Sequence, residues 1–331
     1  ISLGLAPVFG LTTELIVGSA PPEQAGAASG ISETGAELGG ALGIVFVRRQ
    51  LRLESPIIDV TLFRIRAFSA SLGAYFLSIF VVVGYFLFVA QYLQLVVGLS
   101  PLEAGLWSLP SAVAFIIGSQ LAPRVLHDVR PAYVISGGLA MAAAGLFVLS
   151  QVGVTGGLVP LVLGSVIISL GLAPVFGLTT ELIVGSAPPE QAGAASGISE
   201  TGAELGGALG IAIMGSIGVA IYRSELADRL PAAVPAEAAE VARDTLGSAA
   251  AVAGQLPGEL GEAVLDAARE AFVAGMQLSS AIAAGIGVAL AVLALIALRN
   301  QRPADPDDDG EKELVTSSAS HGGPPEAPSG S

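Results

Sequence analysis

The sequence predicts an all-α membrane protein, and three observations support this fold class. Charged residues are 13% of the 331 residues, whereas soluble domains carry about 25%. Hydrophobic residues are 53% of the chain, so lipid is the expected solvent for most of its surface. Apolar runs also recur that reach the roughly 20 residues a helix needs to cross about 30 Å of hydrocarbon.

Six of these apolar runs are expected to be membrane helices, near 68–97, 104–124, 132–150, 158–184, 192–221 and 276–298. The polar segment 223–274 separates the last two runs, and its apolar residues recur at helical spacing. We therefore expect amphipathic surface helices there, the second of which can continue into the last span. From 303 onward Pro, Asp, Ser and Gly dominate, which predicts a disordered tail.

The first residues copy a later part of the chain, because 1–44 recur without a change at 168–211. The internal repeats of transporters are far more diverged than this. The identity therefore indicates a recent duplication, a recombination product or an assembly error. We expect the copy to form a two-helix segment that precedes the six-helix bundle.

These observations divide the chain into six parts. The parts are a duplicated two-helix segment (1–47), a basic loop (48–66), spans one to five (67–222), a loop with amphipathic helices (223–275), the last span (276–298) and a disordered tail (299–331). Loops rich in Arg and Lys beside membrane helices stay in the cytoplasm. Five arginines lie in 48–66, and the turns 98–103 and 151–157 have no Arg or Lys. We therefore expect 48–66 and the tail to be cytoplasmic and 223–275 to be extracellular.

Several classes of function lack support in the sequence. The chain has no Cys and only two His, which excludes thiolate chemistry and predicts no metal site. It has no phosphate-binding loop, GxSxG or HExxH motif, so we expect neither an enzyme nor a cofactor. Its arginines flank apolar runs and do not form the basic face of a nucleic-acid-binding protein.

Acidic residues inside the apolar runs are the main candidates for a proton or cation site. Glu200 and Glu204 lie on one face of the predicted helix 192–221, since residues four apart share a helix face. An ionisable group at the bilayer centre costs about 2.5–3.5 kcal/mol, and such groups usually have a function. Glu181, near the end of the preceding run, is a third candidate. The alternative for all three is a carboxylate solvated at the cytoplasmic end of its helix.

The same runs contain residues that are expected to pack or to line a cavity. Gly202, Gly206 and Gly210 form a GxxxGxxxG series on another stripe of the helix, which lets a neighbouring helix approach closely. Gln91 and Gln94 lie near the end of the run 68–97 and are candidates for polar cavity residues. Hydrogen bonding between helices is the favoured interpretation of the two glutamines.

Two segments resemble a known family. GLSPLEAGLWSLP (98–110) and SAPPEQAGAASGISETGAELGGALGIAIMGSIG (186–218) are similar to segments of fourteen-span drug–proton antiporters of the major facilitator superfamily. The likeness covers 48–300 and is greatest to exporters of quaternary ammonium compounds and methyl viologen. It implies the six-helix C-terminal bundle of the major facilitator fold, in a bacterial plasma membrane, with the C-terminus cytoplasmic.

The resemblance also implies a function and partners. It implies proton-coupled efflux of hydrophobic or cationic drugs, with protons, cationic small molecules and the lipid bilayer as partners and no cofactor. Glu200 falls where such exporters carry an acid that handles cations, and Glu204 and Glu181 fall where related exporters often carry acids. The N-terminal six-helix bundle of the family is missing, so we expect half of a transporter. The alternative is a non-transporting membrane fragment that only associates with other helices.

Overall fold

The computed structural model describes residues 45, 48–49, 60–126 and 129–299, and all regular elements in these residues are helical. The duplicated segment 1–44, most of the basic loop and the predicted tail lie outside the described residues. The elements are η2 (Val60–Arg64), α3 (Arg66–Gln91), η3 (Tyr92–Val96), α4 (Pro101–Leu126), α5 (Pro131–Leu149), α6 (Leu158–Gly185), η4 (Pro189–Gln191), α7 (Ala192–Arg229), α8 (Ala236–Ala242), α9 (Leu246–Ala253) and α10 (Gly258–Leu298).

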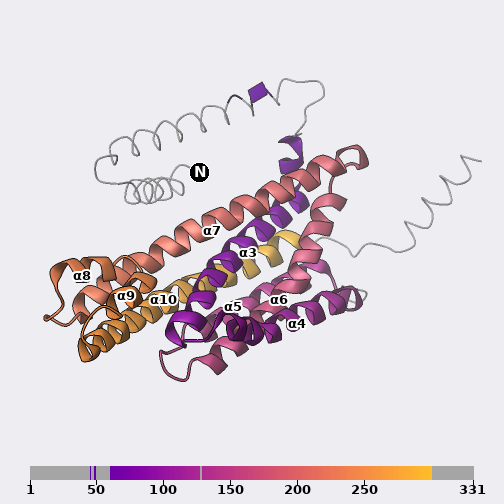
Figure 1. Cartoon of the computed structure of the whole chain (residues 1–331). Coiled ribbons are helices and arrows are strands. Elements are labelled where there is room, and N and C mark those ends of the chain that lie inside the picture. Colours follow the sequence, from indigo (N-terminus) through magenta and orange to yellow (C-terminus); the bar gives the residue numbers. More distant parts are fainter. Residues whose placement is uncertain (1–44, 46–47, 50–59, 127–128, 300–331) are drawn as a thin grey trace, which may run out of the picture.

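Six of the described helices are long and apolar enough to cross a membrane: α3 with η3, α4, α5, α6, α7 with η4, and α10. They form one bundle in which consecutive helices run in opposite directions (Figure 1). This arrangement confirms the predicted all-α fold with six membrane helices. The bundle has two ends, which we call the turn end, where η4 lies, and the cap end, where α8 and α9 lie.

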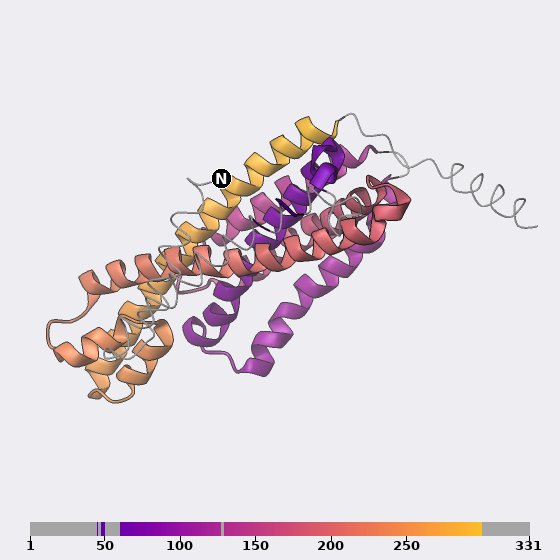
Figure 2. The ribbon, with the colours of Figure 1, turned by 90° about the horizontal axis from the view of Figure 1, so that it is seen from above.

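The last two long helices extend beyond the bundle. At 1.5 Å per residue, α7 is about 57 Å long and α10 about 61 Å, against about 30 Å of hydrocarbon. Their ends pack with α8 and α9 into a cap, which we define as residues 222–275 (Figures 1 and 2). Part of the segment expected as a loop therefore belongs to the long helices: 223–229 continue α7, and 258–274 are continuous with the last span.

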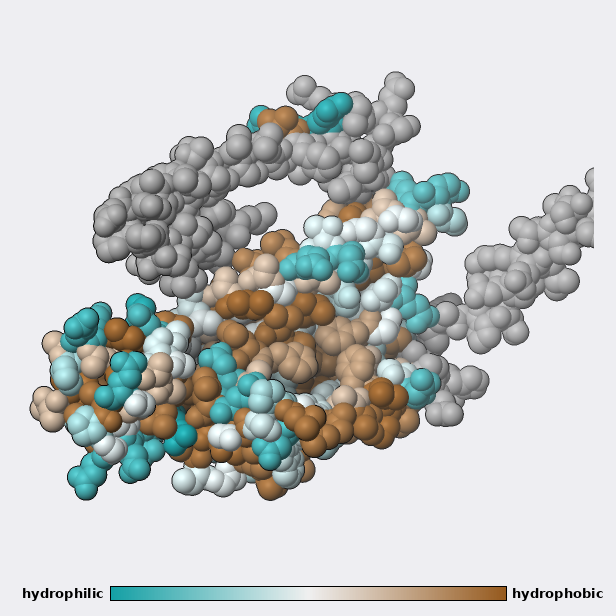
Figure 3. Space-filling view, viewed as in Figure 1, coloured by the Kyte–Doolittle hydropathy of each residue, from teal (hydrophilic) through white to brown (hydrophobic). Residues whose placement is uncertain are grey.

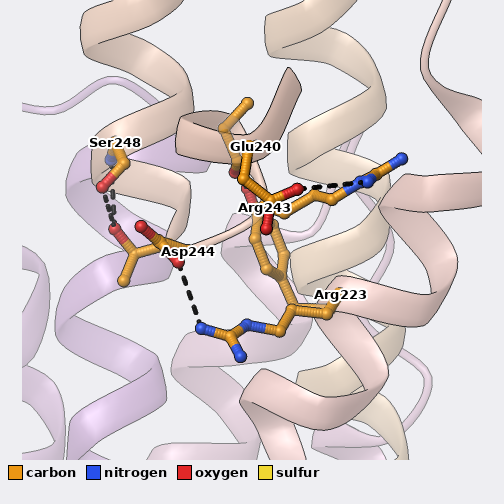
Figure 4. Close-up of polar contacts among 8 residues, drawn as sticks. Arg223, Glu240, Arg243, Asp244 and Ser248 are labelled. Atoms are coloured by element: carbon orange, nitrogen blue, oxygen red, sulfur yellow. Dashed lines mark hydrogen bonds and ion pairs between the residues drawn. The ribbon is translucent and has the colours of Figure 1, made fainter. Parts of the chain in front are cut away.

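A buried apolar core and one buried hydrogen bond hold the cap together. Leu226, Leu246 and Val264 are each at most 2% exposed, and the Tyr222 hydroxyl donates to the Ala242 carbonyl at 2.8 Å. Ion pairs lie outside this core, among them Arg223 with Asp244 at 3.1 Å and Arg243 with Glu240 at 3.4 Å (Figure 4). Exposed pairs contribute little stability, so the apolar contacts hold the four segments together.

Three side-chain hydrogen bonds join the chain segments that meet at the cap end of the bundle. Arg269 donates from Nε to the Leu95 carbonyl at 3.1 Å, in the π-helical turn η3 that ends the first span. The Tyr92 hydroxyl, on the same turn, donates to the Gly153 carbonyl at 2.6 Å, and Gln277 donates to the Val152 carbonyl at 3.0 Å. The end of α3, the α5–α6 turn and α10 are thus joined at one place.

Glycine pairs set the distance between the helices of the bundle. A Cβ atom on Gly138 of α5 would lie 2.3 Å from the Gly171 carbonyl oxygen of α6, and one on Gly171 would lie 2.5 Å from the Gly138 oxygen. Gly145 and Gly164 make a second reciprocal contact, at 2.7 and 3.0 Å. Lipid offers no hydrophobic driving force between helices, so such close backbone packing takes its place.

Arginines lie beside the spans at the turn end, whereas the four arginines of the cap lie among nine acidic residues. Arg66 begins α3, and Arg130 precedes α5 and donates to the Arg299 carbonyl at 3.4 Å, which brings the end of α10 beside the start of α5. At the cap end, the described turns between α3 and α4 and between α5 and α6 contain no Lys or Arg.

Candidate functional site

The candidate site lies on the face of α7 that no helix of the bundle covers. Glu200, Thr201 and Glu204 are all exposed on this face. In Figure 3 a hydrophilic patch lies over α7, and the surface of the bundle beside it is mostly apolar. The structure thus places two carboxylates on an open, otherwise apolar side of a membrane helix.

The opposite stripe of α7 contains the glycine series and packs against α3. A Cβ on Gly206 would lie 2.6 Å from the Phe76 carbonyl oxygen of α3, and one on Gly210 would lie 2.3 Å from the Phe80 oxygen. Gly202 lies at the end of the series nearer η4, and a Cβ added there would lie 3.2 Å from Leu72 Cδ1. Because this stripe must face α3, the helical period turns the two glutamates outward.

The three candidate acids lie at different depths. At 1.5 Å per residue, Glu200 is about 12 Å and Glu204 about 18 Å from the start of α7, while Glu181 is about 6 Å from the end of α6. All three are exposed, and within the described part of the chain none of them forms an ion pair. The carboxylates therefore form a series from the turn end toward the middle of the bundle.

Gln91 and Gln94 bond to their own helix. Gln91 Nε2 donates to the Leu87 carbonyl at 3.1 Å, and Gln94 Nε2 donates to the Ala90 carbonyl at 3.3 Å. Both bonds reach back four residues, whereas we favoured bonds between helices. A long polar side chain on an apolar helix can satisfy itself in this way where no polar partner stands opposite. Neither glutamine lines the cavity described next.

A cavity of about 80 Å³ lies between α3, α4 and α6 in the half of the bundle nearer the cap. Tyr85, Trp107 and Ser165 are among its lining residues, and the Tyr85 hydroxyl donates to Ser165 Oγ at 2.5 Å. Sequence reasoning missed this cavity because its residues come from three helices. The available signal was a polar residue at 85 and at 165 inside apolar runs.

The chemistry open to the α7 face is limited to binding. Unpaired carboxylates can take up a proton or attract an organic cation, and in a low dielectric this attraction is strong. Among the described residues, no three His, Asp or Glu side chains are grouped so that they could hold a metal ion.

Comparison with known proteins relates the chain to efflux, export and resistance proteins. The chain is 37% identical over 257 residues to the multidrug efflux pump LfrA of Mycolicibacterium smegmatis, covering 78% of this chain and 51% of the pump. It is 30% identical over 282 residues to the tetracenomycin C resistance and export protein of Streptomyces glaucescens, covering 84% and 52%. It is 35% identical over 235 residues to the methyl viologen resistance protein SmvA of Salmonella typhimurium, covering 69% and 46%.

The chain spans about half the length of these curated relatives. The family model of the Major Facilitator Superfamily matches residues 45–211, which include the first four spans and the part of α7 that carries both glutamates. The family model matches just over half of the chain, and six apolar helices form one bundle. The chain therefore belongs to the major facilitator superfamily.

Proposed function

We propose that this chain is the C-terminal bundle of a fourteen-span, proton-coupled exporter of hydrophobic cations, and that it works with a second, N-terminal bundle. The observation that carries the proposal is the pair of exposed carboxylates, Glu200 and Glu204, which form no ion pair with the described residues and lie on the open face of an apolar span. Such a face is costly toward lipid and is understandable if a second bundle covers it. Three relatives are named as efflux, export or resistance proteins, which supports the choice of drugs as cargo.

Proton and cation compete for the same carboxylates in the proposed mechanism. A deprotonated Glu200 attracts a cation when the site opens to the cytoplasm. Protonation from the outside removes this attraction and releases the cation there. The two bundles rock about the site, which gives access to one side at a time. Glu204 and Glu181 extend the negative region toward the middle and toward the turn end.

The first test is drug accumulation in cells. Cells without pumps of their own should accumulate less ethidium when they produce the chain together with the N-terminal bundle than when they carry the empty vector. A protonophore should restore accumulation, because the exchange draws on the proton gradient. Equal accumulation in both strains, with both bundles present in the membrane, would favour the alternative of a non-transporting fragment.

We further propose that the turn end is cytoplasmic and the cap extracellular, since arginines lie directly beside the spans at the turn end. The four arginines of the cap belong to a long segment with nine acids, and long segments weigh little in this rule. The chain has no Cys, so single cysteines report their own position. In intact cells an impermeant maleimide should label Gln255→Cys in the cap and should leave Glu190→Cys in η4 unlabelled until the cells are opened. Both side chains are exposed. Labelling of Glu190→Cys alone in intact cells would reverse the orientation.

A further inference from the structure

The cavity between α3, α4 and α6 is separate from the three acids. It lies beside the last turns of α3, which carry Tyr85 and Phe86, the first turns of α4, which carry Trp107, Ser108 and Ser111, and the start of α6, which carries Ser165. These are the ends of the helices nearest the cap. Glu200 lies in the other half of the bundle, about 12 Å from the turn end of α7.

The hydroxyl groups of the cavity offer acceptors and no free hydrogens. Tyr85 donates to Ser165 at 2.5 Å, and Ser165 donates to the Leu161 carbonyl at 2.7 Å. Ser108 donates to the Ala104 carbonyl and Ser111 to the Ser108 carbonyl, both at 2.8 Å. Each hydroxyl hydrogen is therefore used inside the protein, while the oxygens keep lone pairs. The hydroxyl groups of this wall therefore suit a positively charged group, and the Trp107 indole N–H is the donor among the lining side chains that stays open.

Aromatic rings also line the cavity. Phe86 and Trp107 are 56% and 42% exposed, so they lie at the mouth, while Ser165 at 6% and Leu161 at 1% form the floor. The Tyr85 and Phe86 rings lie 5.1 Å apart at 50° to each other. Ring faces attract cations, Trp most strongly. The described lining residues include no charged side chain, so ring faces and hydroxyl oxygens are the groups there that can attract a cation.

The size of the cavity restricts what enters it. A volume of about 80 Å³ equals that of two to three water molecules, since each takes about 30 Å³ in the liquid. A fused ring system does not fit, because a single benzene occupies an apolar cavity of about 150 Å³. On the same scale, about 25 Å³ per heavy atom, the cavity takes about three heavy atoms. Part of a methylated ammonium group therefore enters it, and the rest stays at the open mouth beside Phe86 and Trp107.

We propose that this cavity binds the alkylammonium head group of an organic cation, as a second station distinct from the carboxylates of α7. The proposal rests on the proposed function for the identity of the cargo, but the binding itself needs neither a proton gradient nor a second bundle. In the orientation proposed above, the cavity lies nearer the outside than Glu200. It therefore holds the cation after the carboxylate has released it.

The sole tryptophan of the chain lines the cavity, so its fluorescence reports on occupancy. The purified chain in detergent is titrated with tetramethylammonium and, as the uncharged molecule of similar shape, with tert-butanol. We expect a saturable change in Trp107 emission with the ammonium ion and at least about tenfold weaker binding of the alcohol, because only the cation is attracted electrostatically by the ring faces. Equal affinities, or no saturable change, would overturn the proposal.

Matched variants locate the binding. Phe86→Leu should weaken tetramethylammonium binding about threefold to tenfold by removing one ring face, while Phe86→Tyr should keep it. Phe147→Leu is the control, because Phe147 is 62% exposed on α5 and does not line the cavity. An equal loss in Phe86→Leu and Phe147→Leu would place the site elsewhere. Ethidium export without tetramethylammonium binding would reject the cavity alone, whereas binding without export would reject the proposed function alone.

Discussion

Replacing Glu200 by glutamine is expected to reduce the export of a divalent cation such as methyl viologen at least about tenfold, while a neutral dye loses less than about threefold. Two unit charges 4 Å apart attract by about 4 kcal/mol at an effective dielectric of 20, and 1.4 kcal/mol is a factor of ten. Glutamine has nearly the same shape but no charge, so the change removes this attraction. Initial export rates of both substrates, measured with the N-terminal bundle present, give the ratio.

The controls separate charge from folding. Glu190→Gln changes an exposed acid in η4, outside the apolar part of the span, and should leave both rates within about twofold of the unmodified protein. Glu200→Asp should recover part of the dication export because the charge returns. Equal loss for the dication and the neutral dye would indicate a folding defect, and no loss for either would remove Glu200 from the site.

Gly210→Val is expected to have the second large effect, on stability. Its Cβ would lie 2.3 Å from the Phe80 carbonyl oxygen and 3.1 Å from the Phe80 carbonyl carbon and Cα. Backbone atoms cannot rotate away, so α7 must move from α3, and overpacking of this kind costs about 1–3 kcal/mol. Thermal unfolding followed by Trp107 emission should show a clearly lower midpoint and reduced yield of folded protein.

Gly207→Val is the matched control on the same helix. A Cβ there meets Val83 Cγ2 at 3.6 Å and Ile79 Cγ2 at 3.8 Å, which is ordinary contact. The same change in helix propensity therefore occurs without the backbone collision. If the two variants unfold at the same temperature, the close contact between α3 and α7 does not determine stability, and the orientation of the glutamates needs another explanation.

Most of the fold was predictable because lipid imposes a simple rule. A membrane helix needs about 20 apolar residues, and all six predicted runs correspond to helices of the bundle. The ends were less predictable where a helix leaves the membrane. Residues 223–229 are polar enough to suggest a loop, yet they continue α7 because Tyr222 and Leu226 pack into the core of the cap.

The candidate acids could be found from the sequence, since a Glu in an apolar run is conspicuous whatever surrounds it. The sequence does not show which residues of other helices surround such a side chain. The aromatic cavity depends on three helices whose relative rotation follows from backbone contacts such as that of Gly118 with the Leu170 carbonyl, where a Cβ would lie 3.0 Å from the oxygen. The hydrogen-bond partners of Gln91 and Gln94 likewise depend on which side chains of the neighbouring helices face them. Both glutamines bond to carbonyls of their own helix.

The central claim, that this chain supplies one of two bundles of a proton-coupled exporter, is tested most directly in proteoliposomes. Vesicles loaded with ethidium and given an inward-driving proton gradient would contain the chain alone, the chain with the N-terminal bundle, or no protein. We predict efflux only with both bundles, abolished by a protonophore, because alternating access needs two bundles that rock about one site. Protonophore-sensitive efflux from vesicles with the chain alone, or none with both bundles, would contradict this account.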